Sequence, residues 1–101
     1  MLERLHCGII FTGAFRDWLQ VWQTRSVAEN FGLIPELSYV HCSEGARAGQ
    51  SWISLIWRPL EGVKDHEIFL IGSVRIFLSR QTRSALRERC LDIHDDQIVV
   101  I

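Results

Sequence analysis

The chain has 101 residues, of which 48% are hydrophobic and 23% are charged, and its formal net charge is −1. This composition excludes a disordered chain and gives no overall attraction to nucleic acid or to an anionic membrane. Its apolar runs are far shorter than the roughly 18 residues that a membrane-spanning helix needs, and its three cysteines are widely spaced. We therefore expect a single cytoplasmic domain over residues 1–101, with reduced thiols and no membrane contact.

The N-terminal part is predicted to form a strand followed by an amphipathic helix. Leu5–Phe11 is an apolar run typical of a strand, and Thr12 is suited to cap the helix that follows. The next apolar residues have the spacing of one helical face: Phe15, Trp18, Leu19 and Trp22. A strand over Trp18–Gln23 is the alternative. Ser26 and Glu29 have capping-box spacing for a second short turn, and Gly32 and Pro35 are stop signals.

The middle of the chain is predicted to form two strands around a loop. Leu37–Cys42 is the first strand, and the small, polar segment Ser43–Gly49 is the loop. Ser51–Trp57 is the second strand, and it carries large apolar side chains on both faces. Such a strand is either covered on both sides or part of an interface, so we expect a homodimer with Trp52 or Trp57 at or near the contact.

A hairpin, a helix and a last strand complete the predicted order. The strands Glu67–Ile71 and Val74–Leu78 flank Gly72-Ser73, which suits a type II′ turn, while Leu60–His66 is turn-like. Ser79 can cap a helix over Arg80–Cys90, and Gln97–Ile101 is the last strand. The order predicts an α+β domain with one mixed or antiparallel sheet and two short helices.

Candidate residues for metal or acid–base chemistry are sparse. Cys42 and Cys90 are weak metal candidates, because neither has a second ligand at close spacing, and small buried thiols are the simpler interpretation. His94 and the adjacent Asp95-Asp96 pair are interpreted as a solvated turn. We expect no enzyme activity and no cofactor.

The segment from Arg75 to Arg89 contains five arginines against a single glutamate, which leaves a local net charge of +4. Arg80, Arg83 and Arg87 recur at helical spacing and would form one stripe. Three interpretations stay open: a solvated helix face, a contact with a partner protein, and a contact with nucleic acid.

From end to end, the chain resembles a HesB-like (A-type) iron–sulfur biosynthesis domain. The resemblance begins with the strand, threonine and helix of Ile9–Leu19, and continues with the strand and glycine-flanked loop of Leu37–Gly49. It closes with the hairpin pattern of Gly72–Leu78, the late helical Leu86 and the strand start at Leu91-Asp92-Ile93.

The family's ligand positions are not occupied by cysteine here. The family's first cysteine ligand lies in the glycine-rich loop, where this chain has Ala46-Arg47-Ala48, and its Cys-Gly-Cys motif is absent from these residues. The resemblance therefore implies the fold without the metal site, and a module that recognises a protein partner. An iron or iron–sulfur carrier with displaced ligands and a small nucleic-acid-binding protein are the alternatives.

Overall fold

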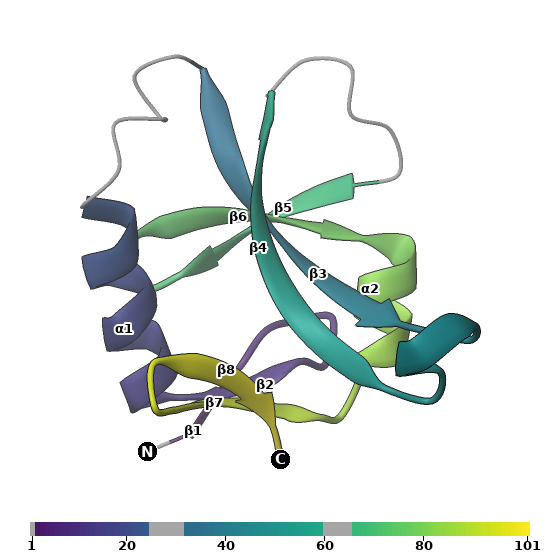
Figure 1. Cartoon of the computed structure of the whole chain (residues 1–101). Coiled ribbons are helices and arrows are strands. Elements are labelled where there is room, and N and C mark those ends of the chain that lie inside the picture. Colours follow the sequence, from purple (N-terminus) through teal and green to yellow (C-terminus); the bar gives the residue numbers. More distant parts are fainter. Residues whose placement is uncertain (1, 25–31, 60–65) are drawn as a thin grey trace.

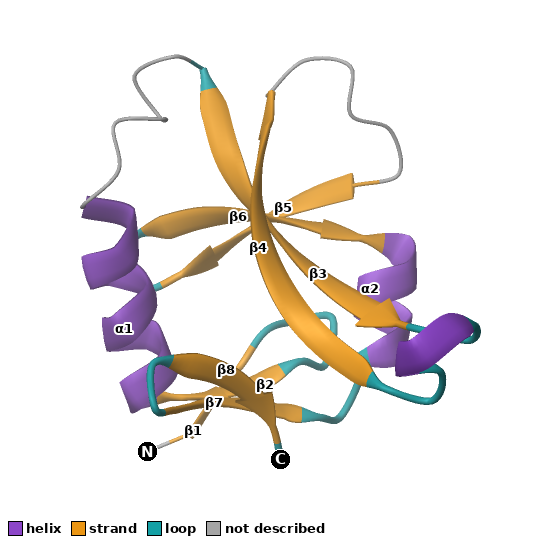
Figure 2. Cartoon of the chain, viewed as in Figure 1, coloured by secondary structure: helices purple, strands orange, loops and turns teal. Residues whose placement is uncertain are grey.

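Two four-stranded sheets and two α-helices make up the described part of the chain, residues 2–24, 32–59 and 66–101 of the computed structural model (Figures 1 and 2). The first sheet has the order β1-β2-β7-β8, with β1 Leu2–Arg4, β2 Ile10–Thr12, β7 Cys90–His94 and β8 Gln97–Val100. The second has the order β4-β3-β6-β5, with β4 Ser51–Pro59, β3 Leu33–His41, β6 Val74–Ser79 and β5 His66–Ile71. The helices are α1 Gly13–Thr24 and α2 Arg80–Ala85, and a 3₁₀ turn, η2 Gly45–Arg47, lies between β3 and β4. Neither described helix is long and apolar enough to cross a membrane.

The α+β class and the mixed strand directions were predicted, but the single sheet was wrong. Both sheets combine antiparallel hairpins with one parallel pair, β2 with β7 in the first sheet and β3 with β6 in the second. In the first sheet, β2 near the start of the chain pairs with β7 near its end, Ile10 with Cys90 and Phe11 with Leu91. Pairing over such a separation leaves no local pattern in the sequence, so the second sheet could not be anticipated.

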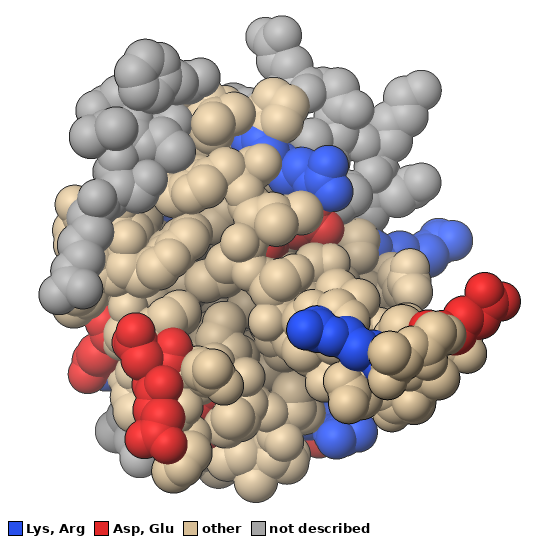
Figure 3. All heavy atoms as spheres, in the orientation of Figure 1, with Lys and Arg blue, Asp and Glu red and all other residues tan. Residues whose placement is uncertain are grey.

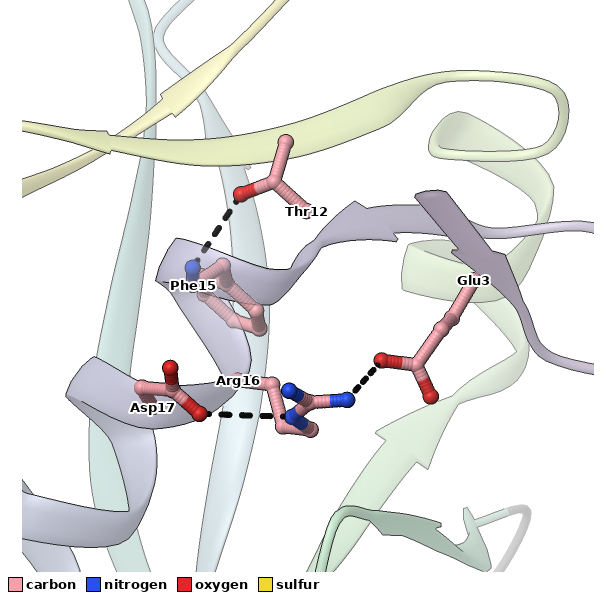
Figure 4. Close-up of polar contacts among 5 residues, drawn as sticks. All are labelled: Glu3, Thr12, Phe15, Arg16 and Asp17. Atoms are coloured by element: carbon pink, nitrogen blue, oxygen red, sulfur yellow. Dashed lines mark hydrogen bonds and ion pairs between the residues drawn. The ribbon is translucent and has the colours of Figure 1, made fainter. Parts of the chain in front are cut away.

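The first helix begins where the threonine cap was predicted. The Phe15 backbone N–H donates to the Thr12 hydroxyl oxygen at 3.1 Å (Figure 4). The same hydroxyl donates to the Asp92 carboxylate at 2.7 Å, which ties the start of α1 to β7. Arg16 extends from the outer side of the helix to Glu3 on β1 and to its neighbour Asp17 (Figure 4). The strand alternative for Trp18–Gln23 is therefore wrong over the residues of α1.

The predicted apolar face of α1 is confirmed as part of a core shared by both sheets. Phe15 and Leu19 are fully buried, while Trp18 and Trp22 are partly buried and pack against the same cluster. The inner face of the β4-β3-β6-β5 sheet supplies half of the opposing side chains, among them Leu37, Ile53, Leu55, Val74, Ile76 and Leu78. The two sheets and α1 thus bury one continuous apolar cluster.

The predicted first strand, Leu5–Phe11, is wrong in its extent. The Leu5 N–H donates to the Ile9 carbonyl at 2.8 Å and the Gly8 N–H to the Leu5 carbonyl at 2.9 Å, so a tight turn separates β1 from β2. Gly8 has a φ of 101°, a conformation that glycine adopts at little cost. The apolar residues alone suggested a strand here. Leu5 and Ile9 are buried, but they belong to a turn and not to a strand.

The second strand of the prediction begins too late, because β3 starts at Leu33 and contains Pro35. Along β3 the register pairs Ile34 with Arg58 and Glu36 with Ile56. Backbone N–H and C=O groups alternate sides along a strand, so Pro35, between Ile34 and Glu36, directs its backbone toward β6 and not toward β4. The pairing of β3 with β6 consists of one residue pair, Glu36 with Phe77. The missing N–H therefore removes no hydrogen bond to β4. The turn predicted at Ser26 and most of the Leu60–His66 turn lie outside the described residues.

The hairpin of β5 and β6 is confirmed, and the helix after it is shorter than predicted. Ile71 pairs with Val74 across Gly72-Ser73, and Gly72 has a φ of 62°. Ser79 caps α2 by accepting from the Thr82 N–H at 3.1 Å. The helix ends at Ala85, and Cys90 opens β7 rather than ending a helix. The last strand ends at Val100.

The chain leaves α2 in a turn that is fixed to the N-terminal turn. The Glu88 N–H donates to the Gly8 carbonyl at 3.0 Å, and the Arg89 N–H donates to the Leu86 carbonyl at 2.9 Å. Glu88 has a φ of 61°, which a right-handed helix does not allow. Strand pairing of β7 with β2 therefore overrides the helical spacing of the residues that follow Ala85.

Candidate functional site

Three arginines predicted to form a stripe lie around one shallow cavity of about 280 Å³. The cavity is lined by Cys7, Arg80, Arg83, Ser84 and Arg87. Two of the arginines come from α2, while Arg87 comes from the turn that follows it, so the prediction of a single helical stripe is wrong for this residue. Cys7 comes from the turn between β1 and β2. The arginine pocket, as we call this cavity, thus combines three guanidinium groups with a hydroxyl and a thiol.

The helix that carries two of these arginines is anchored to the large sheet. Thr82 is buried, and its hydroxyl oxygen accepts from the Tyr39 N–H of β3 at 3.2 Å and from the Ser79 hydroxyl at 3.1 Å. This anchor holds α2, and with it the backbone of Arg80 and Arg83, against β3. Arg87 packs closely against Gly8, because a Cβ on Gly8 would lie 3.2 Å from the Arg87 Cγ atom.

The three arginines differ in how much of their hydrogen-bonding capacity is used. Arg83 donates to Glu67 Oε1 at 2.6 Å and, through Nε, to the Ser79 carbonyl at 3.4 Å. Arg80 and Arg87 are exposed, and neither donates to a carboxylate among the residues that the structure describes. Two guanidinium groups at the arginine pocket therefore remain able to bind an anionic group in bidentate fashion.

The three cysteines are free thiols in different parts of the fold. All are half-buried, whereas Cys42 and Cys90 were predicted to be buried. The Cys42 thiol donates to the Glu44 carbonyl at 3.0 Å, and Cys90 lies at the start of β7. Across residues 2–24, 32–59 and 66–101, no three His, Cys, Asp or Glu side chains gather where they could hold a metal ion. Cys7 is the residue that sequence reasoning missed, because no local motif connects it with α2.

The tryptophans define a second feature, which the sequence did not predict, because Trp18, Trp22 and Trp52 line one cavity. Trp57 stacks on Trp22, with ring centres 5.1 Å apart, and Arg47 lies over the Trp52 ring at 5.5 Å. The Trp18 indole N–H donates to Asp96 at 2.6 Å. Trp52 or Trp57 was predicted to lie at or near a dimer contact, and their side chains leave β4 on opposite faces.

A groove lies between the tryptophans and β8. Its two halves have volumes of about 400 Å³ and about 480 Å³, and both are lined by Trp52, Ile53, Gln97 and Ile98. Figure 3 shows a largely uncharged surface over β4 and β8, with acidic side chains gathered near the turn between β7 and β8. We call this feature the tryptophan groove.

The outer face of the large sheet, opposite the core, carries exposed apolar side chains. The register aligns Ile56, Glu36, Phe77 and Ile68 in one row across it. Trp52 and Ile56 are each 36% exposed, and Ile68 and Leu70 are 45% and 61% exposed. Within this row Glu36 is buried and accepts from Arg58 at 2.8 Å.

The acidic cluster before the last strand is a solvated turn, as predicted. Asp95 and Asp96 have φ values of 50° and 62°, which join β7 and β8 through a two-residue turn, and both are exposed. Asp92, in the middle of β7, differs from Asp95 and Asp96 in its hydrogen bonds. The Thr12 hydroxyl, and then the Ile93 backbone N–H, hold the pKa of Asp92 below its usual value.

No model of a known protein family matches this sequence, and no similar curated protein or solved structure was found.

Proposed function

We propose that this protein is a non-catalytic binding module that holds an acidic segment of a partner protein at the arginine pocket. The domain beneath the pocket is, in this proposal, a HesB-like fold that has lost the metal ligands of that family. The convergence of Arg80, Arg83 and Arg87 on one cavity is the observation that carries the proposal.

The HesB-like part of the proposal is supported by the order and local chemistry of the elements. Thr12 caps α1 after a short strand, and a two-residue hairpin leads into a short helix and then a strand. The loop between β3 and β4 is closed by hydrogen bonds between Cys42 and Gln50 and between Gly49 and Cys42. That loop holds Ala46-Arg47-Ala48 at the place where the family has a cysteine.

An acidic peptide suits the arginine pocket better than nucleic acid does. The pocket offers two uncommitted guanidinium groups, and it is bordered by the carboxylates of Glu67 and Glu88, which are paired with Arg83 and Arg4. Nucleic acid presents a long row of phosphates and rewards an extended basic surface. Two neighbouring carboxylates on a short acidic segment match the compact cluster of arginines. A nucleic acid would also bring further phosphates close to the carboxylates of Glu67 and Glu88, which would repel them.

A homodimer through the outer sheet face is part of the same proposal. Trp52, Ile56, Ile68 and Leu70 are four of the large apolar side chains that the structure leaves exposed. Two-fold pairing is the commonest way to cover such a face, since one self-complementary patch suffices. The arginine pocket, on α2 and the N-terminal turn, would stay open in this dimer.

Binding of a labelled hexaglutamate peptide tests the function. The double variant Arg80→Ala/Arg87→Ala should weaken binding at least about tenfold, because charge-assisted hydrogen bonds contribute about 1.5–3 kcal/mol each. Arg47→Ala/Arg75→Ala is the matched control, since it removes the same charge away from the arginine pocket, and it should change binding less than about twofold. Equal losses in both variants, or tighter binding of a single-stranded oligonucleotide than of the peptide, would contradict the proposal.

A further inference from the structure

The tryptophan groove lies between two strand edges that have no partner strand. Among the described strands, β4 pairs with β3 alone and β8 pairs with β7 alone. Each is therefore an edge strand, β4 of the large sheet and β8 of the other sheet. Figures 1 and 2 show the lower part of β4 passing beside β8 at the junction of the two sheets. The core is closed there by side chains and not by a hydrogen-bonded ladder.

The lining of the larger half of the groove identifies it as an edge site. Its wall includes Ser51, Trp52 and Ile53 in succession on β4 and the whole of β8, Gln97–Val100. Successive strand residues point to opposite faces, so a cavity in contact with all of them is bounded by the strand edges. Unpaired backbone N–H and C=O groups are what such an edge presents.

The register shows which backbone groups these are. The Ile101 N–H donates to the Cys90 carbonyl at 2.7 Å, so the alternation of the ladder turns the backbone groups of Ile98 and Val100 away from β7. Just before β4, the Gln50 carbonyl accepts from the Cys42 N–H at 2.9 Å. The same alternation along β4 turns the backbone N–H and C=O of Ile53 away from β3. Both edges therefore direct donors and acceptors toward the groove.

The side chains around the groove add apolar contact, hydrogen-bond donors and charge. The indole N–H groups of Trp22 and Trp52 have no acceptor among the residues that the structure describes, unlike that of Trp18. Arg89 lines the half of the groove near the end of β8, and Asp96 lines the half near α1. A ligand with opposite charges at its two ends would be matched by both.

We propose that the tryptophan groove binds an extended peptide segment of a partner protein by strand addition to the free edge of β8. The segment carries an acidic side chain toward Arg89, a basic side chain toward Asp96, and small apolar side chains between them. This mode of recognition draws affinity from backbone hydrogen bonds and specificity from side-chain pockets. Four residues of β8 match a segment of about four residues, which spans roughly 13 Å.

A second copy of the chain does not suit the groove. In a two-fold dimer each surface meets its own copy, so a concave groove would face another concave groove. The groove is also separate from the arginine pocket, which lies beside α2, so the two sites can be tested independently.

Titration of the 15N-labelled protein with the hexapeptide KTVTVE tests the proposal. The amide signals of Ile98 and Val100 should shift, and a KTVTVE peptide N-methylated at both valines should bind at least tenfold more weakly, because it lacks donors to the β8 edge. The charge-reversed peptide ETVTVK should bind the wild type more weakly than KTVTVE does. Arg89→Glu leaves an acidic residue at both ends of the groove, so it should abolish this preference.

The paired variants Ile98→Pro and Ile98→Ala separate the backbone from the side chain. Proline removes a donor that is not used in the β7 ladder, so Ile98→Pro should bind KTVTVE at least tenfold more weakly than Ile98→Ala. If Ile98→Pro does not fold, the N-methylated peptide decides the question by itself. Equal binding of the methylated peptide, or no shift of Ile98 and Val100 at millimolar peptide, overturns the proposal. So does a wild-type dimer in which both amides are already protected from exchange.

Discussion

Replacing Phe15 with alanine should remove about a fifth or more of the free energy of unfolding. The Phe15 side chain is fully buried, with the rings of Phe11 and Trp18 at 6.3 Å and 6.5 Å from its own. Truncation of a core phenylalanine costs about 3–5 kcal/mol, which combines lost transfer energy with the cavity left behind. A domain of this size is stable by about 5–15 kcal/mol, so the midpoint of thermal unfolding should fall by roughly 12 °C or more.

Urea unfolding followed by tryptophan fluorescence measures this loss, and the same helix provides the control. Val21 is 50% exposed on α1, so Val21→Ala should change the free energy of unfolding by less than about 0.5 kcal/mol. A loss below about 1 kcal/mol for Phe15→Ala, or equal losses for the two variants, would refute the assignment of the buried face of α1.

Three further predictions concern acid stability, association and metal content. The pKa of Asp92 in the folded protein lies below its usual value, so its contribution to stability is present above that usual value and is lost as the pH falls through the lowered pKa. Asp92→Asn should therefore be less stable at neutral pH and lose less stability on acidification. If the variant loses as much stability in acid as the wild type does, the Thr12 hydrogen bond is not the cause of the lowered pKa. In sedimentation at tens of micromolar, the wild type should be a dimer that Trp52→Glu dissociates, whereas a wild-type monomer or an indifferent dimer would exclude the outer-face contact; Trp57→Glu tests the other predicted contact residue. Protein purified anaerobically should be colourless with well under one iron per chain, and Cys42→Ser should leave peptide binding intact; a brown protein that loses its absorbance in this variant would favour the iron carrier.

Elements defined by local chemistry were predictable from the sequence. The spacing of Phe15 and Leu19, the cap at Thr12 and the cap at Ser79 depend on residues only a few positions apart, and all three are present in the structure. Elements defined by distant pairing were not. The helix after Ser79 ends early because Cys90 is needed opposite Ile10, and only the folded chain brings these two residues together.

The same distinction applies to the candidate sites. Arg80 and Arg83 share a surface through local helical spacing, as the sequence indicated, but Arg87 arrives through a turn, and Cys7 arrives from the other end of the chain. The tryptophan groove had one partial signal, the apolar residues on both faces of Ser51–Trp57. That signal predicted an interface on a strand face, which stays a prediction, and the unpaired edge of the same strand had no signal in the sequence.

Mapping the hexaglutamate contact by 15N NMR tests the central claim most directly. If the arginine pocket holds acidic segments, the largest amide shifts should occur at Cys7, Gly8 and residues 80–88, and they should disappear in Arg80→Ala/Arg87→Ala. Shifts centred elsewhere, or shifts that persist in the double variant, would contradict the claim that this pocket is the binding site.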